Sequence, residues 1–159
     1  MEILSGILEW NIVEIASALK ISVDDVEEYF TDGRRISFVL ERRLSTEFFG
    51  GKIAESEGAN FDLVDDKGRK WEVRSISGKG TYFCPSYMVG SGRSFNEEGF
   101  INKLDAIEGY ILCDIEAFPK VPFFVVSSLI VRKWWIDRQL GNSTKVSRKK
   151  ILGLIQNIK

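Results

Sequence analysis

The chain has 159 residues, of which 44% are hydrophobic and only three are proline, so it can form one domain with a substantial core. A net charge of −1 argues against a protein that binds polyanions over its whole surface, and the absence of histidine excludes His-dependent metal fingers and a histidine general base. Cys84 and Cys113 lie far apart in the sequence, which supports neither a disulfide framework nor a cysteine-rich zinc site.

Charge is distributed unevenly along the chain. Residues 1–66 hold 15 acidic and 6 basic side chains, whereas residues 132–159 hold 8 basic side chains and one acid, Asp137. This basic end suits phosphate binding, or it is an ordinary solvated surface. We expect no signal peptide and no membrane span, because the start lacks a basic region and the longest apolar stretch, residues 121–131, is too short. A cytoplasmic protein with reduced thiols is therefore expected.

The first fifty residues predict three helices. Apolar residues at spacings of three and four predict one over residues 2–19. Ser22 is a candidate N-cap for a second helix that ends near Phe30, and a third is expected over residues 34–48. The first two helices have the order of a helix-turn-helix, but the acidity of the second would repel DNA phosphates. A scaffold role is the better interpretation of this pair.

A β-hairpin is predicted over residues 61–76. Two runs rich in aromatic and β-branched residues flank a turn at residues 66–68, where glycine is available for a positive φ. If the turn centres on its middle residue, Asp62 lies directly across from Glu72, and Arg74 projects from the same strand face as Glu72. Two carboxylates and a cation then converge, which suits a divalent metal with hard oxygen ligands. The alternative is an exposed hairpin with solvated charges.

This hairpin resembles the core of the PD-(D/E)xK nuclease superfamily, in which an acid and then, after a gap, acid-x-lysine form the metal and catalytic centre. The likeness is to small homodimeric type II restriction endonucleases. The matching residues are Asp62, Val64, Asp65, Gly68, Trp71, Glu72, Val73, Arg74, Ser75 and Ile76. Two features depart from the pattern: no proline precedes Asp62, and Arg74 stands where the lysine is expected.

The resemblance implies an α/β (α+β), restriction-endonuclease-like fold, with a mixed central sheet flanked by helices. A single nuclease domain would span residues 1–159. Within it, residues 1–50 would form a helical scaffold or dimerisation segment, and residues 58–159 the catalytic core. The implied activity is that of an Mg²⁺-dependent type II restriction endonuclease that cuts double-stranded DNA at a short specific site, with Mn²⁺ as a substitute metal. The implied assembly is a homodimer.

The resemblance also implies roles for individual residues. Asp62 and Glu72 would ligate the metal, Arg74 would hold the scissile phosphate, and Glu41 would be an auxiliary acid from the helix before the hairpin. Arginine cannot serve as a general base because its pKa is too high, so Lys70, on the same strand face as Glu72, is a candidate partial substitute. Three alternatives stay open: an inactive DNA-binding member of the fold, a structure-specific or repair nuclease, and a protein-interaction domain.

A glycine-rich stretch follows the hairpin and extends to about residue 96. Its polar side chains suit phosphate contacts and base-edge readout, because arginine favours guanine and asparagine favours adenine. An ordinary flexible loop is the alternative. The predicted DNA-binding residues are Lys79, Tyr82, Arg93, Ser94 and Asn96.

The remainder of the chain predicts alternating helices and strands. We expect Trp134 and Trp135 to be packing anchors rather than platforms for base stacking. The predicted elements are a short helix over residues 102–108, strands over residues 110–115 and 122–126, a helix over residues 129–140 ended by Gly141, and a final helix capped by Ser147.

Overall fold

A mixed six-stranded sheet forms the centre of the fold. The structure is a computed structural model, and it describes residues 4–56 and 59–158. The strand order is β1-β7-β6-β4-β3-β2; β4 and β6 run parallel, and the other neighbours are antiparallel. These strands are β1 (Ser5–Glu9), β2 (Lys52–Ile53), β3 (Leu63–Val64), β4 (Lys70–Ile76), β6 (Gly109–Asp114) and β7 (Lys120–Ser127). A small second sheet pairs β5 (Thr81–Tyr82) with β8 (Lys145–Val146).

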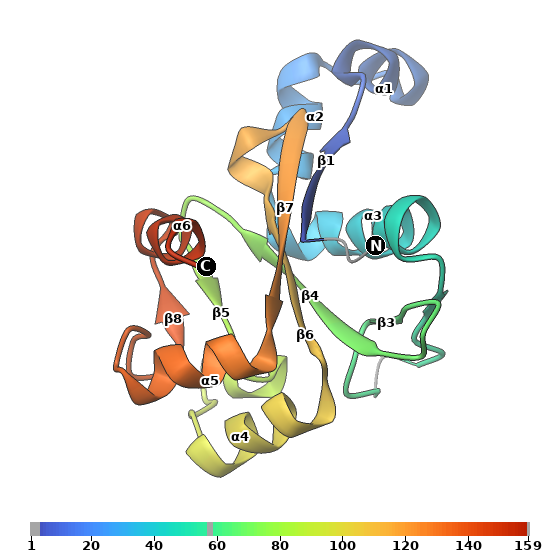
Figure 1. The fold of residues 1–159 in the computed structure, drawn as a ribbon. Helices are drawn as coiled ribbons and strands as arrows, with labels where there is room; N and C mark the ends of the chain where they lie inside the picture. The colour runs from blue at the N-terminus through green and yellow to red at the C-terminus, as the bar shows by residue number, and fades with distance from the viewer. Residues whose placement is uncertain (1–3, 57–58, 159) are drawn as a thin grey trace.

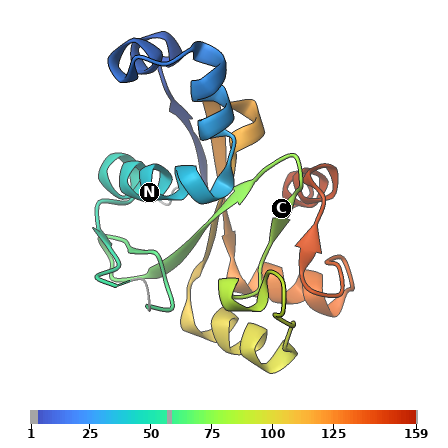
Figure 2. The same cartoon turned by 180° about the vertical axis from the view of Figure 1, so that it is seen from behind.

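Helices cover the central sheet on both sides. In Figures 1 and 2, α3 lies on one side of the sheet, α5 and α6 lie on the other, and α1 and α2 project from one end. The helices are α1 (Ile12–Leu19), α2 (Val23–Phe30), α3 (Gly33–Leu44), α4 (Glu97–Ala106), α5 (Ser128–Ile136) and α6 (Arg148–Gln156). The prediction of a single α+β domain with a mixed sheet is confirmed at this level. None of these helices is both long and apolar enough to cross a lipid bilayer.

Two hydrophobic clusters form the core, one on each face of the sheet. Val73 and Ile111 belong to the cluster that contains residues of α2 and α3, whereas Tyr110 and Leu112 belong to the cluster that contains residues of α4 and α5. Strand β6 is buried on both faces, which explains its continuous apolar sequence. Because side chains alternate along β4, Glu72 lies on the face opposite Val73, toward α4 and α5.

The first half of the predicted helix over residues 2–19 is wrong from residue 4 onward. Residues 2 and 3 lie outside the described residues. Residues Ser5–Glu9 form β1, which pairs with β7, and α1 begins only after its N-cap Asn11. Leu8 is buried and Ile7 is 55% exposed, the alternation of an edge strand. A spacing of four residues fits the period of a strand as well as that of a helix, so the sequence pattern was ambiguous.

The second and third predicted helices are confirmed. The Ser22 hydroxyl accepts the N–H of Asp25, and the Asp25 carboxylate accepts the N–H of Ser22, which forms a capping box at the start of α2. Helix α3 continues into a π-helical turn, Ser45–Phe49, and ends at Gly50 with φ +64°. Glycine adopts that angle without strain, so Gly50 ends the helix cleanly.

Several predicted boundaries downstream need correction. Helix α4 begins at Glu97 rather than residue 102, because Asn96 caps it by accepting the N–H of Gly99. Helix α5 ends at Ile136, well before Gly141. Strands β2, β5 and β8 were not predicted, since two residues carry no periodic signal and these strands exist only through pairing with distant segments.

Candidate active site

Within the strands the hairpin adopts the predicted register, with Leu63 directly across from Trp71, but the ladder begins at Leu63 and does not include the predicted pair Asp62 and Glu72. Asp62 immediately precedes β3, and its backbone N–H donates to the carbonyl of Trp71 at 2.9 Å. Its side chain reaches across to β4, where Oδ2 accepts the backbone N–H of Val73 at 2.8 Å. The Asp62 carboxylate is therefore fixed beside the strand that carries Glu72.

The second acid of the hairpin motif, Asp65, builds the turn. Its buried carboxylate accepts the backbone N–H groups of Lys67 and Arg69, the Nε–H of Arg69 at 2.7 Å and the indole N–H of Trp71 at 2.9 Å. Burial alone would raise the pKa of Asp65, but the Trp71 indole and the other donors hold it below its ordinary value. Asp65 therefore has a structural role that stabilises the register.

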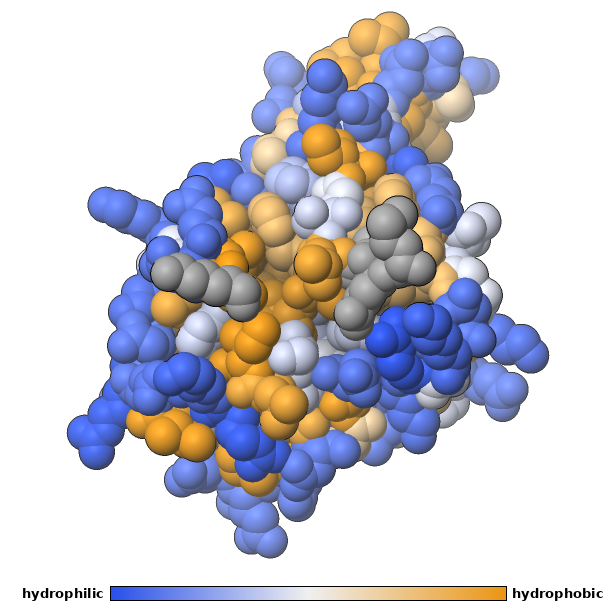
Figure 3. All heavy atoms as spheres, viewed as in Figure 1, coloured by the Kyte–Doolittle hydropathy of each residue, from blue (hydrophilic) through white to orange (hydrophobic). Residues whose placement is uncertain are grey.

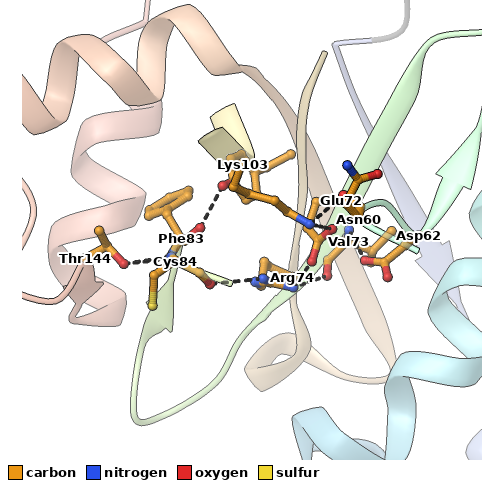
Figure 4. A network of polar contacts seen from close by, with 10 residues as sticks. Asn60, Asp62, Glu72, Val73, Arg74, Phe83, Cys84, Lys103 and Thr144 are labelled. Atoms are coloured by element: carbon orange, nitrogen blue, oxygen red, sulfur yellow. Dashed lines mark hydrogen bonds and ion pairs between the residues drawn. The ribbon is translucent and has the colours of Figure 1, made fainter. Parts of the chain in front are cut away.

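Glu72 lies between two cations, as Figure 4 shows. Its Oε1 accepts a hydrogen bond from Nη1 of Arg74 at 2.5 Å, and its Oε2 accepts one from Nζ of Lys103 at 2.6 Å. All three side chains are buried, with 8–9% of each exposed. The Arg74 contact follows from the predicted strand face, whereas Lys103 was not predicted.

Lys103 reaches the site from α4. Its Nζ also donates to the carbonyl of Asn60 at 2.7 Å, two residues before Asp62 in the sequence. On α4 it belongs to the buried side of the helix together with Phe100 and Leu104. A lysine within an apolar helical stripe predicts a buried partner for its ammonium group, and this signal was present in the sequence.

Arg74 is held from several directions. Its Nη2 donates to the carbonyl of Cys84 at 3.2 Å, and its guanidinium lies 4.8 Å from the centroid of the Tyr82 ring. Burial alone would lower the pKa of Arg74, but the negative charge of Glu72 raises it above its ordinary value. Arg74 is therefore a fixed positive charge.

The C-terminal part of the chain supports Arg74 through Thr144. The fully buried hydroxyl of Thr144 accepts the N–H groups of Phe83 and Cys84, which fixes the carbonyl to which Arg74 donates (Figure 4). Thr144 adopts φ +65°, an uncommon angle for a β-branched residue. A backbone angle that is sterically unfavourable persists only where surrounding contacts hold the residue in place. Here those contacts also position the Cys84 carbonyl that Arg74 binds.

Two carboxyl groups near Glu72, those of Asp62 and Glu41, have raised pKa values. Burial, followed by the charge of Glu72, raises the pKa of Asp62 to about 6, even though the N–H of Val73 and the charge of Arg74 oppose the shift. Burial, followed by the charge of Asp62, raises the pKa of Glu41 on α3 to about 7. Glu41, Asp62 and Glu72 therefore lie close enough to repel one another, and the role of Glu41 as an auxiliary acid stays a prediction.

Replacing Glu41 with glutamine is expected to reduce the loss of stability that accompanies rising pH. Below about pH 4.5 the Glu41 carboxyl is protonated in both the folded and the unfolded chain. Between pH 4.5 and about 7 the unfolded chain releases the proton first, so the free energy of unfolding falls as the pH rises. Thermal unfolding across this range should show Glu41→Gln gaining a few degrees over the wild type by pH 7.5. A difference that does not change with pH would contradict the raised pKa.

The donor set at this point suits a hard divalent cation. Carboxylate and carbonyl oxygens are the preferred ligands of Mg²⁺, and a cation at this point would favour the ionised form of Asp62 against the burial and the charge of Glu72 that raise its pKa. In residues 4–56 and 59–158, no three acid, cysteine or histidine side chains form a group that could hold a metal. A cation would therefore depend on Asp62, Glu72 and a backbone carbonyl such as that of Val73, together with water or substrate oxygens.

The predicted DNA-binding residues are distributed along the segment between β4 and α4. Lys79 and Ser94 are exposed, and Tyr82 is half-buried beneath Arg74. Arg93 donates to two carbonyls of its own loop, and Asn96 caps α4. DNA contact by these five side chains stays a prediction, although Arg93 and Asn96 already hold the loop in place.

Two other sequence expectations can be placed. Lys70 is exposed and its Nζ lies 5.1 Å from the centroid of the Phe61 ring. Trp134 is buried, and the Trp135 indole donates to Glu97 of α4, so the prediction that both tryptophans are packing anchors is confirmed. Comparisons of the chain with models of protein families, with curated proteins and with solved structures find no match. The function is therefore inferred from the chemistry of the site.

Proposed function

We propose that this chain is a metal-dependent endonuclease that hydrolyses phosphodiester bonds of double-stranded DNA, with a restriction-endonuclease-like fold. The observation that carries the proposal is the convergence of Asp62, Glu72 and Arg74 on one point of the hairpin, in the arrangement that the PD-(D/E)xK resemblance implies. The mixed sheet flanked by helices supports the same fold. A buried glutamate with two half-buried acids beside a fixed cation suits phosphoryl chemistry better than a purely structural role.

Each residue of the site has a separate role in the proposed reaction. Asp62 and Glu72, with the Val73 carbonyl, would hold Mg²⁺, which when bound supplies Lewis-acid stabilisation and activates water for attack. Arg74 binds the scissile phosphate and stabilises its developing charge. Among the described residues, Nε of Arg74 is buried and has no acceptor, so this donor remains for a ligand. Glu41, once deprotonated above about pH 7, would add a third negative charge that favours a cation near Asp62.

Digestion of plasmid DNA tests the proposed function directly. Wild-type protein with Mg²⁺ or Mn²⁺ should convert supercoiled plasmid into discrete fragments, and excess chelator should stop the reaction. The fragment ends would define a recognition site and support a type II restriction role. Random degradation would favour a repair or structure-specific nuclease, and intact plasmid under all conditions would refute the nuclease proposal.

A second candidate is a DNA-binding protein of the same fold without turnover. Both carboxylate oxygens of Glu72 are already paired with internal cations, and Arg74 cannot transfer a proton. Such a protein would bind duplex DNA in a salt-dependent manner and leave it uncut. The digestion experiment separates the two candidates.

We expect the protein to act as a homodimer, since cleavage of both strands at a palindromic site needs two centres. Apolar side chains gather at the projecting end of the molecule (Figure 3), where Val13, Leu19, Ile21 and Val23 are 65%, 59%, 43% and 41% exposed. A second copy would bury such a surface. Sedimentation equilibrium should report a dimer for the wild type and a monomer for Val13→Glu, and a monomeric wild type at all concentrations would contradict this expectation.

A further inference from the structure

Lys103 brings a second cation to the centre of the site. Its Nζ is 2.6 Å from Oε2 of Glu72, on the opposite carboxylate oxygen from the one that Arg74 contacts. The side chain is 9% exposed, so the ammonium group is removed from bulk solvent. Burying a lysine is costly, and one carboxylate shared with an arginine compensates for it only in part.

The ammonium group has an unused donor. An ammonium group carries three N–H bonds, of which one meets Glu72 and one meets the carbonyl of Asn60 at 2.7 Å. Within the described residues, no protein acceptor is present for the third. Figure 4 shows Lys103 extending from α4 to the group formed by Glu72, Arg74 and Asp62, so the unused donor lies in the site.

The helix that carries Lys103 is held in a fixed position. Arg132 of α5 forms an ion pair with Asp105, and the indole of Trp135 donates to Glu97 at 3.1 Å. A residue positioned by a rigid element can supply a charge at a defined point. Lys103 therefore has the placement of a functional group.

We propose that Lys103 is a catalytic residue that binds the scissile phosphodiester, and that it supplies the amine which the hairpin lacks at Arg74. This role rests on the proposed function, since it assigns a partner to the same site. In the protein alone, Glu72 holds the ammonium group. When the charge of Glu72 is neutralised, Lys103 turns its donors to a phosphate oxygen of the DNA while Arg74 keeps its fixed position. Two cations then act on one phosphate, which suits the charge that develops in hydrolysis.

A double-mutant cycle on DNA affinity tests this role without turnover. Binding of a fluorescent duplex is measured in chelator for wild type, Glu72→Gln, Lys103→Met and the double variant. Glu72→Gln releases Lys103, so its affinity should rise by more than about tenfold, the worth of one charge-assisted hydrogen bond. The logarithmic salt slope should become steeper by about 0.9. Both gains should disappear when Glu72→Gln is combined with Lys103→Met in the double variant.

The controls separate this role from simpler explanations. Lys133→Met removes one exposed charge from α5 and should leave the gain of Glu72→Gln intact. If Lys103→Met fails to fold, Lys103→Gln replaces it, because glutamine keeps a donor for the Asn60 carbonyl. A gain that persists in the double variant would show that Glu72→Gln acts only by removing a negative charge, and it would overturn the role of Lys103 alone. Absence of DNA binding in every variant, including the wild type, would overturn the proposed function as well.

Discussion

Replacing Asp62 with asparagine is expected to reduce DNA cleavage in Mg²⁺ by about a thousandfold or more. The side chain loses the charge that would bind the cation, and a bound metal contributes several kcal/mol of transition-state stabilisation, at about 1.4 kcal/mol for each factor of ten. Asparagine keeps an oxygen that can accept the N–H of Val73, so the hairpin should remain folded. The rate of plasmid cleavage by equal amounts of folded protein measures this effect.

Asp66 provides the matched control for this experiment. It lies on the same hairpin, four residues from Asp62, and its side chain is exposed. Asp66→Asn removes the same charge and should keep nearly full cleavage activity. Equal losses in the two variants would show that Asp62 acts through the overall charge of the hairpin, and unchanged cleavage by Asp62→Asn would exclude it as a metal ligand.

Replacing Glu72 with alanine is expected to cause the largest loss of stability of any single change at the site. The substitution leaves Arg74 and Lys103 as two buried cations without their shared carboxylate. Breaking a buried ion pair in this way costs about 3–5 kcal/mol. For a chain of this size each kcal/mol corresponds to about 2–4 °C, so the thermal midpoint should fall by roughly 6–20 °C.

Lys103→Met is the control variant for this prediction. It removes one cation and leaves the Glu72–Arg74 pair intact, so its loss of stability should be clearly smaller than that of Glu72→Ala. Thermal unfolding of both variants in chelator gives the two values. Equal losses would indicate that the cost comes from packing at the centre of the site rather than from uncompensated charge.

The hairpin could be predicted in detail because its register is a local property. Turn chemistry at residues 66–68 and the alternation of Trp71 and Val73 with Glu72 and Arg74 determine which side chains share a face. The structure adds one feature that pattern cannot show: Asp62 replaces part of the strand ladder with a side-chain contact to Val73. The capping of α2 by Ser22 was predictable for the same reason, since a cap involves residues only a few positions apart.

Contacts between distant segments could not be predicted. Lys103 meets Glu72 across 31 residues, and Thr144 meets Cys84 across 60. The stripe on α4 marked Lys103 as unusual, but no sequence rule states which carboxylate its ammonium group meets. Strand β1 was misassigned because Leu4, Leu8 and Ile12 fit both a helix and a strand, and only pairing with β7 decides between them.

Calorimetric titration of a divalent cation in the presence of duplex DNA tests the central claim most directly. Ca²⁺ serves as the titrant if Mg²⁺ permits turnover, and the protein is compared with its Asp62→Asn and Asp66→Asn variants. Wild type and Asp66→Asn should take up the cation with similar affinity, and Asp62→Asn should show little or no uptake. Uptake that is absent from the wild type, or unchanged by Asp62→Asn, would contradict a metal centre at this hairpin.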